Sequence, residues 1–459
     1  MQLPPLFLSR MQTLLGEELA AFLAAYERPL RRGLRVNTLK LPTAAFRSLS
    51  ALPLEPAPFS PDSFYLDIPH KAGSDPLHHA GAYYMQEPSA CSAVSVLAPQ
   101  PGERVLDLCA APGGKSGQIA AALQNTGLLW SNEYVPARAH ILQQNLERLG
   151  VRRGVVSCSD TGRLCAGLAG WFDAVLVDAP CSGEGMFRKE PQALDGWSLD
   201  NIHLCAARQQ EILQNAAAAV RPGGRLVYST CTFAPEENEG VIAAFLQQNP
   251  DFSLQRIAVP WGCSGFPAQA LRAFVPAIAG TADLTACRRI LPQHGGEGHF
   301  IALLRRDGNA AAPLPVTYEP PKNDPHSAAA ADLYAGCFRQ PPEGVFVTHG
   351  ELVRLLPPEL PALTGLGVLS AGIAAAQVCK NRLEPCHAAF MAAAPADCHR
   401  VLELPPDSQE LAAFLHGAEL PCAGENGWTA VATAGLTTGF GKCAGGRLKN
   451  RYPKGLRLL

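Results

Sequence analysis

The chain has 459 residues, of which 47% are hydrophobic and only 17% are charged. Because a single domain usually holds roughly 100 to 200 residues, this length predicts two or three domains, each with its own core. The formal net charge of −2 gives no global sign of nucleic-acid binding, and no run of about 18 apolar residues indicates a membrane span.

The first part of the chain, residues 1–90, is expected to form a small α+β module that binds RNA. An amphipathic pattern predicts a helix over residues 7–26, and a short strand-like segment follows at Leu34–Lys40. Four arginines cluster around the start of that segment, at Arg28, Arg31, Arg32 and Arg35. A local basic cluster of this kind can contact an RNA backbone even when the net charge is near zero.

From about residue 100 to 250, strand-like and helical patterns alternate, and this alternation is typical of a mostly parallel sheet with helices on both faces. We therefore assign residues 91–306 to one α/β domain with a Rossmann-like sheet. Strands are expected at 104–108, 127–133, 154–160, 172–177 and 224–229, with helices from 115, over 136–149 and 201–220, and from 235. The segment from Gly298 to Leu304 is predicted to add an antiparallel edge strand.

Residues 307–343 are rich in Ala and Pro, a composition that predicts a linker. The remainder, residues 344–459, has short apolar runs broken by Gly and Pro and is expected to fold as a β-rich domain. Its last twenty residues contain six basic side chains and no acidic one, namely Lys442, Arg447, Lys449, Arg451, Lys454 and Arg457. These side chains either contact RNA or form a solvated basic tail.

The most informative loop is Cys109-Ala-Ala-Pro-Gly-Gly-Lys-Ser, which follows the predicted strand at 104–108. It resembles a phosphate-binding P-loop, but Cys109 stands where that loop requires its first glycine. The stiff Ala110-Ala111-Pro112 run is also unlike an anion cradle, and no GxGxxG pattern is present. The glycines Gly113 and Gly114 still leave the backbone open to a ligand.

Three acidic residues lie at the carboxyl ends of successive predicted strands, where the loops of a doubly wound sheet meet along one edge. Glu133 can accept hydrogen bonds from ribose hydroxyls, Asp160 can accept one from an adenine edge, and Asp178 can face an ammonium group. S-adenosylmethionine has all three groups, so we expect it as the cofactor. Taken singly, each acidic residue is as well explained as a helix cap or a solvated loop residue.

Fifteen cysteines occur without a CxxC pair, and the start of the chain does not resemble a signal peptide. This pattern predicts free thiols in a reducing compartment and a cytoplasmic protein. Most of these thiols are expected to be small buried hydrophobes. Cys181 and Cys231 differ, because each follows a strand end near the expected cofactor. Zinc is the competing explanation, but no paired cysteine spacing or HxxxH element accompanies them, and we expect no metal.

A thiolate beside a methyl donor has a specific use. Carbon 5 of cytosine is not nucleophilic, but attack of a thiolate on carbon 6 converts the ring to an enamine whose carbon 5 can take a methyl group. This is covalent catalysis, which splits one difficult step into accessible ones. A carboxylic acid near ring nitrogen 3 would stabilise the adduct, which gives Asp178 a second role.

The sequence resembles the Nop/Sun family of RNA cytosine-5 methyltransferases. The resemblance rests on five segments, namely Arg35-Val-Asn-Thr, Gly81-Ala-Tyr-Tyr-Met-Gln-Glu-Pro-Ser-Ala, Asp107-Leu-Cys-Ala-Ala-Pro-Gly-Gly-Lys-Ser, Asp178-Ala-Pro-Cys-Ser-Gly-Glu-Gly-Met-Phe-Arg-Lys and Tyr228-Ser-Thr-Cys-Thr-Phe-Ala-Pro-Glu-Glu-Asn-Glu. It implies that Cys231 is the nucleophile and that Cys181 assists release of the methylated RNA. It also implies that Lys115 and Asp178 lie beside the target base, and that the backbone from Cys109 to Lys115 holds the cofactor.

The C-terminal part is similar to the tail domain of the bacterial small-subunit ribosomal RNA methyltransferase F group, which resembles a PUA domain. The similarity includes the segment Gly439-Phe-Gly-Lys-Cys-Ala-Gly-Gly-Arg-Leu-Lys-Asn-Arg-Tyr-Pro. It implies that the substrate is 16S ribosomal RNA, free or in the small ribosomal subunit, and a monomer is expected. Two departures occur: Gly298-His-Phe stands where an aromatic pair is common, and Cys386 is unusual in its segment. Neither is expected to affect the chemistry.

Three alternatives stay open at this point. The same chemistry could act on transfer RNA. A small-molecule methyltransferase would share the cofactor loop but would leave both extra domains unexplained. A non-catalytic RNA-binding factor of ribosome assembly would be expected to lose a thiol or the run from Asp178 to Cys181, and this chain keeps both.

Overall fold

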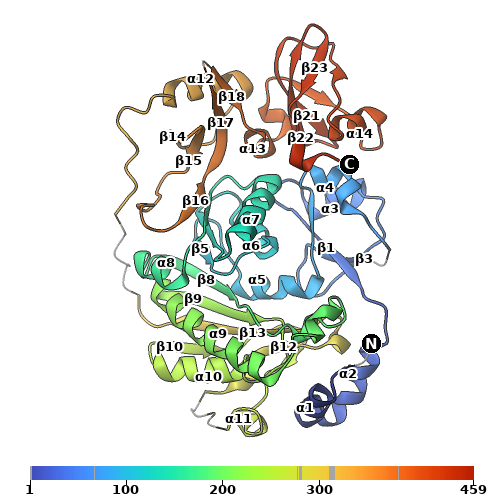
Figure 1. Cartoon of the computed structure of the whole chain (residues 1–459), viewed down its shortest axis with the longest axis vertical. Coiled ribbons are helices and arrows are strands. Elements are labelled where there is room, and N and C mark those ends of the chain that lie inside the picture. The colour runs from blue at the N-terminus through green and yellow to red at the C-terminus, as the bar shows by residue number, and fades with distance from the viewer. Residues whose placement is uncertain are drawn as a thin grey trace.

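A computed structural model describes residues 3–66, 68–276, 278, 282–309, 316–380 and 382–458. A ten-stranded sheet crosses the middle of the molecule (Figure 1) in the order β11-β12-β13-β9-β8-β5-β6-β7-β16, and β10 pairs with β13 as well. The strands are β5 (Arg104–Asp107), β6 (Leu128–Asn132), β7 (Gly154–Ser157), β8 (Phe172–Asp178), β9 (Val220–Thr230), β10 (Phe252–Gln255), β11 (Cys263–Ser264), β12 (Arg288–Ile290), β13 (His299–Arg306) and β16 (Val368–Ala371).

Five neighbouring strands of this sheet, β9, β8, β5, β6 and β7, run parallel, so their carboxyl ends share one edge. The expected alternation of strands and helices is therefore present. The predicted antiparallel strand exists as β13, but β12 and β10 pair on its far side, so it is not an edge strand. The connecting helices are α5 (Ser92–Leu97), α6 (Gly114–Leu123), α7 (Pro136–Leu149), α8 (Thr161–Gly167), α9 (Leu199–Ala219), α10 (Glu239–Gln248) and α11 (Ala268–Leu271).

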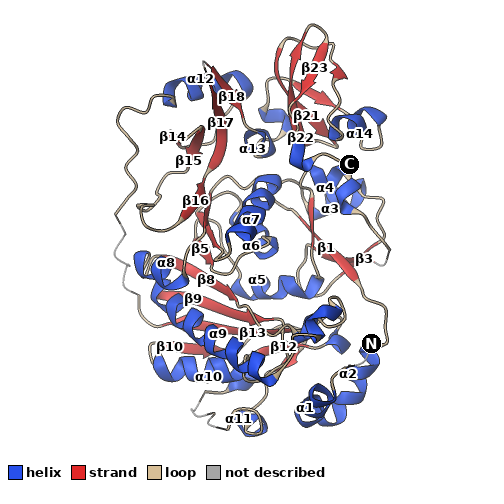
Figure 2. Ribbon diagram, in the orientation of Figure 1, coloured by secondary structure: helices blue, strands red, loops and turns tan. Residues whose placement is uncertain are grey.

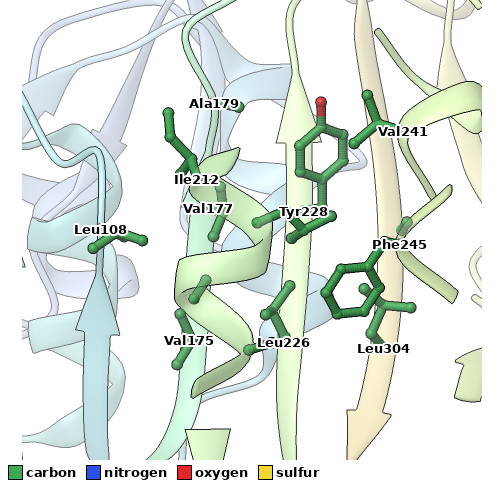
Figure 3. Close-up of a cluster of buried hydrophobic side chains, with 14 of the residues drawn as sticks. Leu108, Val175, Val177, Ala179, Ile212, Leu226, Tyr228, Val241, Phe245 and Leu304 are labelled. Carbon is green, nitrogen blue, oxygen red and sulfur yellow. The ribbon is translucent and has the colours of Figure 1, made fainter. Parts of the chain in front are cut away.

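Side chains alternate between the two faces of the sheet, and each face builds its own core. On β8, Val175 and Val177 pack with residues of α8, α9 and α10, whereas Ala174 and Leu176 pack with α5, α6 and α7. Figure 3 shows the first face, with Val175, Val177, Leu226 and Tyr228 drawn around the helix that carries Ile212. Both faces of these strands are buried, which explains why their sequences are continuous apolar runs.

Local signals set the helix ends. Helix α7 begins at Pro136, a residue suited to a first turn, and ends before Gly150, whose φ of 79° only glycine adopts readily. The predicted helix over residues 7–26 is instead two helices, α1 (Pro5–Leu15) and α2 (Leu19–Tyr26). They separate at Gly16, which has a φ of 55°. The amphipathic pattern continues across this break, so periodicity alone did not indicate it.

The N-terminal module contains a four-stranded antiparallel sheet in the order β2-β3-β1-β4, which confirms the expected α+β character. Its strands and helices are β1 (Arg32–Val36), α3 (Thr43–Leu49), β2 (Leu54–Pro56), β3 (Ser63–Leu66), α4 (Pro76–His79) and β4 (Tyr83–Met85). Helices α1 and α2 lie apart from this sheet, against the central domain (Figure 2).

The C-terminal part has two further sheets, in the orders β14-β15-β17-β18 and β19-β21-β22-β23-β20. Its elements are α12 (Ser327–Cys337), β14 (Val345–His349), β15 (Leu352–Leu356), β17 (Ile373–Cys379), β18 (Arg382–Pro385), α13 (His387–Met391), β19 (Val401–Glu403), α14 (Gln409–Leu415), β20 (Leu420–Pro421), β21 (Gly427–Thr433), β22 (Leu436–Ala444) and β23 (Arg447–Asn450). Between β15 and β17, strand β16 leaves this part and pairs with β7 of the central sheet.

The structure corrects the expected linker over residues 307–343 in its second half. Helix α12 lies inside that range, and its Tyr334 and Cys337 are buried with Phe338 in a core shared with β15 and α13. An alanine-rich composition is compatible with a helix as well as with a linker, so composition alone did not predict helix α12. Among the described residues, no helix is long and apolar enough to cross a membrane.

Candidate active site

The loop after β5 lies at the shared carboxyl edge of the parallel strands, as the sequence predicts. Leu108 N–H donates to Leu176 O at 2.9 Å and Ala110 N–H donates to Asn132 O at 2.8 Å, so the loop is fixed to β8 and β6 on either side. Ala110 and Ala111 are buried, Cys109 is half-buried and Pro112 is exposed. Gly113 has a φ of 111°, and α6 starts at Gly114. A helix start of this kind directs backbone N–H groups at a ligand.

The three predicted carboxylates lie at three different strand ends of this edge. Glu133 is buried after β6, where it accepts from Val135 N–H at 2.9 Å and lies 3.4 Å from the Arg138 guanidinium. Asp160 is exposed after β7 and caps α8 by accepting from Arg163 N–H at 3.1 Å. Its second oxygen makes no hydrogen bond with any described residue. Asp178 ends β8.

Asp178 and Lys115 form an ion pair, with the Lys115 Nζ donating to the Asp178 Oδ2 at 2.7 Å. The Ser229 hydroxyl donates to the other oxygen of Asp178, also at 2.7 Å. Burial by itself would raise the pKa of the Asp178 carboxyl, but the Lys115 ammonium and the Ser229 hydroxyl together lower it. Burial would also lower the pKa of Lys115, yet the Asp178 carboxylate raises it. Both groups are therefore charged near neutral pH.

The structure brings the two predicted thiols into contact, since the Sγ atoms of Cys181 and Cys231 are 3.2 Å apart. Cys231 N–H also donates to the Cys181 Sγ at 3.4 Å. The hydrogen bond with Cys231 and burial both raise the pKa of the Cys181 thiol well above its ordinary range. Cys181 thus keeps its proton near neutral pH.

Two buried glutamates hold the loops of these thiols together. Glu237 accepts from Ser182 N–H at 2.9 Å and from the Gln209 amide at 2.8 Å. Glu184 accepts from the Thr232 hydroxyl at 3.0 Å and from Phe233 N–H at 2.9 Å. Sequence reasoning quoted both residues within motifs without giving them a role. For Glu184 the available signal was its position between two glycines, Gly183 and Gly185.

Aromatic side chains of the N-terminal helices brace the same loops. Phe22 of α2 meets Phe233 edge-on, with ring centroids 5.2 Å apart, and Phe7 of α1 meets Phe187 at 5.3 Å. Arg10 adds an ion pair with Glu236 at 2.7 Å. Helices α1 and α2 therefore support the segments that follow both thiols, a role that their amphipathic pattern did not reveal.

One predicted RNA contact is wrong. Arg35 is 1% exposed, and its guanidinium donates to Gly114 O and to the Gln86 side chain, each at 3.3 Å, so it fixes the start of α6 to the N-terminal module. The sequence did not indicate that Arg35 is buried, because a polar residue in a strand is expected to face solvent. Arg28 and Arg32 are exposed, as are Lys442, Arg447, Lys449, Arg451 and Lys454 in the C-terminal part.

A set of three residues beside the thiols was not predicted. Ser89 Oγ lies 3.0 Å from the Nδ1 of His299, and it also donates to the Glu87 carboxylate at 2.5 Å. The charges of Lys115 and Asp178 act on the His299 ring. Sequence reasoning placed His299 outside the chemistry, although its position in a normally aromatic pair was the signal. Within the described residues, no three His, Cys, Asp or Glu side chains are arranged to hold a metal ion.

Known families match all three parts of the chain. The model described as 16S rRNA methyltransferase RsmB/F matches residues 94–305. The N-terminal domain of 16S rRNA methyltransferase RsmF matches residues 3–88, and the methyltransferase RsmF PUA domain matches residues 401–458. Ribosomal RNA small subunit methyltransferase F of Shigella boydii is 35% identical over 99% of this chain and 96% of its own length. The chain belongs to the RsmF family.

The same values hold for the RsmF relative of Escherichia coli strain K12. Among solved structures, a methyltransferase homolog protein from Pyrococcus horikoshii is 31% identical, with a TM-score of 0.58, and covers 66% of this RsmF-family chain and 94% of its own. NSun6 from Pyrococcus horikoshii, solved with SFG, shares the fold at 22% identity and a TM-score of 0.55, over 67% of this chain and 99% of its own. The predicted family and the predicted fold class are both confirmed. The chain is thus a member of a family of 16S rRNA methyltransferases.

Proposed function

We propose that this chain transfers a methyl group from S-adenosylmethionine to carbon 5 of a cytosine in 16S ribosomal RNA, through a covalent adduct with Cys231. The observation that carries the proposal is the 3.2 Å contact between the Cys181 and Cys231 sulfur atoms beside the Lys115–Asp178 ion pair. One thiol can attack a base while the other stays protonated. The names of the RsmF relatives, which act on small-subunit ribosomal RNA, support the substrate.

The residues at the strand ends fit the cofactor. The backbone from Cys109 to Lys115 would hold its amino-acid part, Glu133 its ribose and Asp160 its adenine, while Asp178 would face its ammonium group. Support comes from the hydrogen-bonding character of the site, which offers acceptors at three successive strand ends and N–H groups at the start of α6. When bound, S-adenosylmethionine supplies an electrophilic methyl group.

In the proposed reaction, the Cys231 thiolate attacks carbon 6 of the flipped cytosine and forms a carbon–sulfur bond. The electron pair of the ring moves toward nitrogen 3, where the Lys115 ammonium, held by the Asp178 carboxylate, stabilises the negative charge, and carbon 5 becomes nucleophilic enough to take the methyl group. Loss of the carbon 5 proton to a base and cleavage of the carbon–sulfur bond restore the aromatic ring. The Cys181 thiol would donate a hydrogen bond to the departing sulfur of Cys231.

The variant Cys231→Ala tests this proposal. It should abolish transfer of tritiated methyl groups to RNA but change cofactor affinity, measured by calorimetry, by no more than a few-fold, because the thiol acts on the base. Cys205→Ala, which removes a buried thiol of α9, is the matched control and should retain transfer. Measurable turnover by Cys231→Ala would remove Cys231 as the nucleophile.

Bisulfite sequencing of total RNA from cells that lack the gene tests the substrate. Loss of a methylated cytosine in 16S ribosomal RNA is expected, whereas loss in transfer RNA would redirect the proposal. If no site is lost and the purified protein retains RNA on a filter without labelling it, the chain is a non-catalytic RNA-binding factor. We expect the exposed basic side chains to contact RNA, and the protein to act as a monomer in the cytoplasm.

A further inference from the structure

His299 is positioned to touch the same base that Cys231 attacks. It is the first residue of β13, and the next residue, Phe300, pairs with Thr230 of β9. Strand β9 ends at Thr230, and the same antiparallel register extended by one residue would place His299 opposite Cys231. His299 also lies close enough to Lys115 and Asp178, the ion pair of the proposed site, for their charges to act on its ring.

Hydrogen bonds fix which nitrogen of His299 carries the proton. Glu87 accepts from the backbone N–H groups of Ser89 and Ala90, each at 3.0 Å, and from the Ser89 hydroxyl at 2.5 Å. Ser89 has one hydroxyl hydrogen, which Glu87 takes, so Ser89 Oγ can only accept from His299. The 3.0 Å contact is therefore a donation from the His299 Nδ1–H to Ser89.

This arrangement leaves the other ring nitrogen of His299 as an acceptor. Neutral imidazole carries one N–H, so with Nδ1 protonated the Nε2 presents a lone pair. Burial lowers the pKa of His299, which keeps the ring neutral. Nε2 makes no hydrogen bond with any residue in the described ranges, although the side chain is only 7% exposed. An acceptor without a partner on a side chain that is almost fully buried can bind a ligand group that donates.

We propose that His299 is a specificity-determining residue whose Nε2 accepts a hydrogen bond from the 4-amino group of the target cytosine. This inference rests on the proposed function. Cytosine carries an amino donor at carbon 4, whereas uracil carries a carbonyl acceptor there, so a fixed acceptor favours cytosine and repels uracil. A site with a buried polar group aimed at one substrate donor discriminates against an analogue that lacks it, because the protein group then stays unpaired.

A cycle that changes both the residue and the base tests the proposal. The full-length enzyme and His299→Phe, which keeps a ring of similar size but has no acceptor, are each given RNA with cytosine at the target position. Each is also given the same RNA with pyrimidin-2-one, which is cytosine without the amino group. Single-turnover transfer of labelled methyl groups is measured for all four pairs. We expect His299→Phe to slow transfer to cytosine about tenfold and transfer to pyrimidin-2-one by less than about twofold.

An equal loss of rate on both bases would overturn the proposal, because His299 would then act on something other than the amino group. His387→Phe is the matched control, since His387 is a half-buried histidine whose Nδ1 is buried without a partner among the described residues, but it belongs to α13. Whatever loss of transfer rate His387→Phe causes, that loss should be the same on both bases. Ser89→Ala, which frees the ring to change tautomer, should lower the preference for cytosine in the same direction as His299→Phe.

The failure of this inference is distinguishable from failure of the proposed function. If the wild-type enzyme transfers no label to either RNA, the proposed function fails and His299 is not the cause. If wild-type transfer is normal and His299→Phe matches it on cytosine, only the assignment of His299 fails. Calorimetry with the cofactor shows whether each variant is folded before rates are compared.

Discussion

Replacing Asp107 with asparagine should change the pH dependence of stability. Asp107 ends β5 beneath the cofactor loop and is fully buried. Its Oδ2 accepts from the Ser116 hydroxyl at 2.6 Å, but its Oδ1 has no partner in the described parts of the chain. Burial, helped by the charges of Asp178 and Glu133 and opposed by the hydrogen bond from Ser116, raises the pKa of this carboxyl from 3.8 to about 7.

The sign and size of the effect follow from this pKa. Between pH 3.8 and about 7 the folded chain binds a proton at Asp107 that the unfolded chain has lost, so the free energy of unfolding falls as pH rises. Each pKa unit corresponds to about 1.4 kcal/mol, so two pH units from 5 to 7 give up to about 3 kcal/mol. The side chain introduced by Asp107→Asn carries no such penalty, although its unpaired amide group costs about 1–3 kcal/mol at every pH.

Urea unfolding of both proteins at pH 5, 6, 7 and 8 measures the difference. The stability of Asp107→Asn relative to the wild type should rise from pH 5 to 7 and then level off. Asp173→Asn is the control at the opposite end of the sheet. Burial alone would raise the pKa of Asp173, but hydrogen bonds from Arg104 and Arg221 lower it, so its loss should cost the same at all four pH values. Parallel curves for Asp107→Asn and the wild type would refute a protonated Asp107.

The site itself gives three further predictions. Cys181→Ala should still attack cytosine but release it poorly, which would leave an RNA-dependent band on a denaturing gel that reductants do not dissolve. Cys181→Ala combined with Cys231→Ala should lack that band. If the band persists in the double variant, the roles of the two thiols are reversed. Glu133→Ala should raise the Michaelis constant for the cofactor more than it lowers the maximal rate, and unchanged saturation would exclude a ribose contact. Phe22→Ala should cost about 3–5 kcal/mol of stability and also lower turnover, because Phe22 packs on Phe233 beside the Cys231 loop. Phe245→Ala, which removes a ring packed on Phe252, should cost similar stability with less loss of turnover per folded molecule.

Much of the fold was predictable because local signals and the tertiary structure agree. Helix α7 follows the residues that begin and end it, Pro136 and Gly150, and the apolar runs of β5, β8 and β9 belong to strands buried on both faces. The two thiols could be placed at one sheet edge because each follows a parallel strand. Their separation of 3.2 Å could not be predicted, since it depends on how Glu184 and Glu237 fix two loops.

The features that sequence reasoning missed depend on contacts between distant segments. The burial of Arg35 becomes visible only when Gly114 and Gln86 are placed beside it. The role of His299 requires Ser89, which lies more than two hundred positions earlier in the chain. A composition rich in alanine describes α12 and a flexible linker equally well. In each case the sequence contains the residues but does not show which of them are in contact.

Strand β16 has a consequence for how the protein can be made and divided. It covers β7, which would otherwise be an edge strand with unpaired backbone groups, and it comes from the C-terminal half of the chain. During synthesis the catalytic sheet therefore stays open on that side until Ala371 has left the ribosome, and exposed edges of this kind invite pairing with other chains. A fragment that stops at residue 306 would keep both thiols and the cofactor loop but would carry this open edge permanently. Residues 94–305 thus match one family model, yet their sheet is completed only by β16, which follows them in the chain.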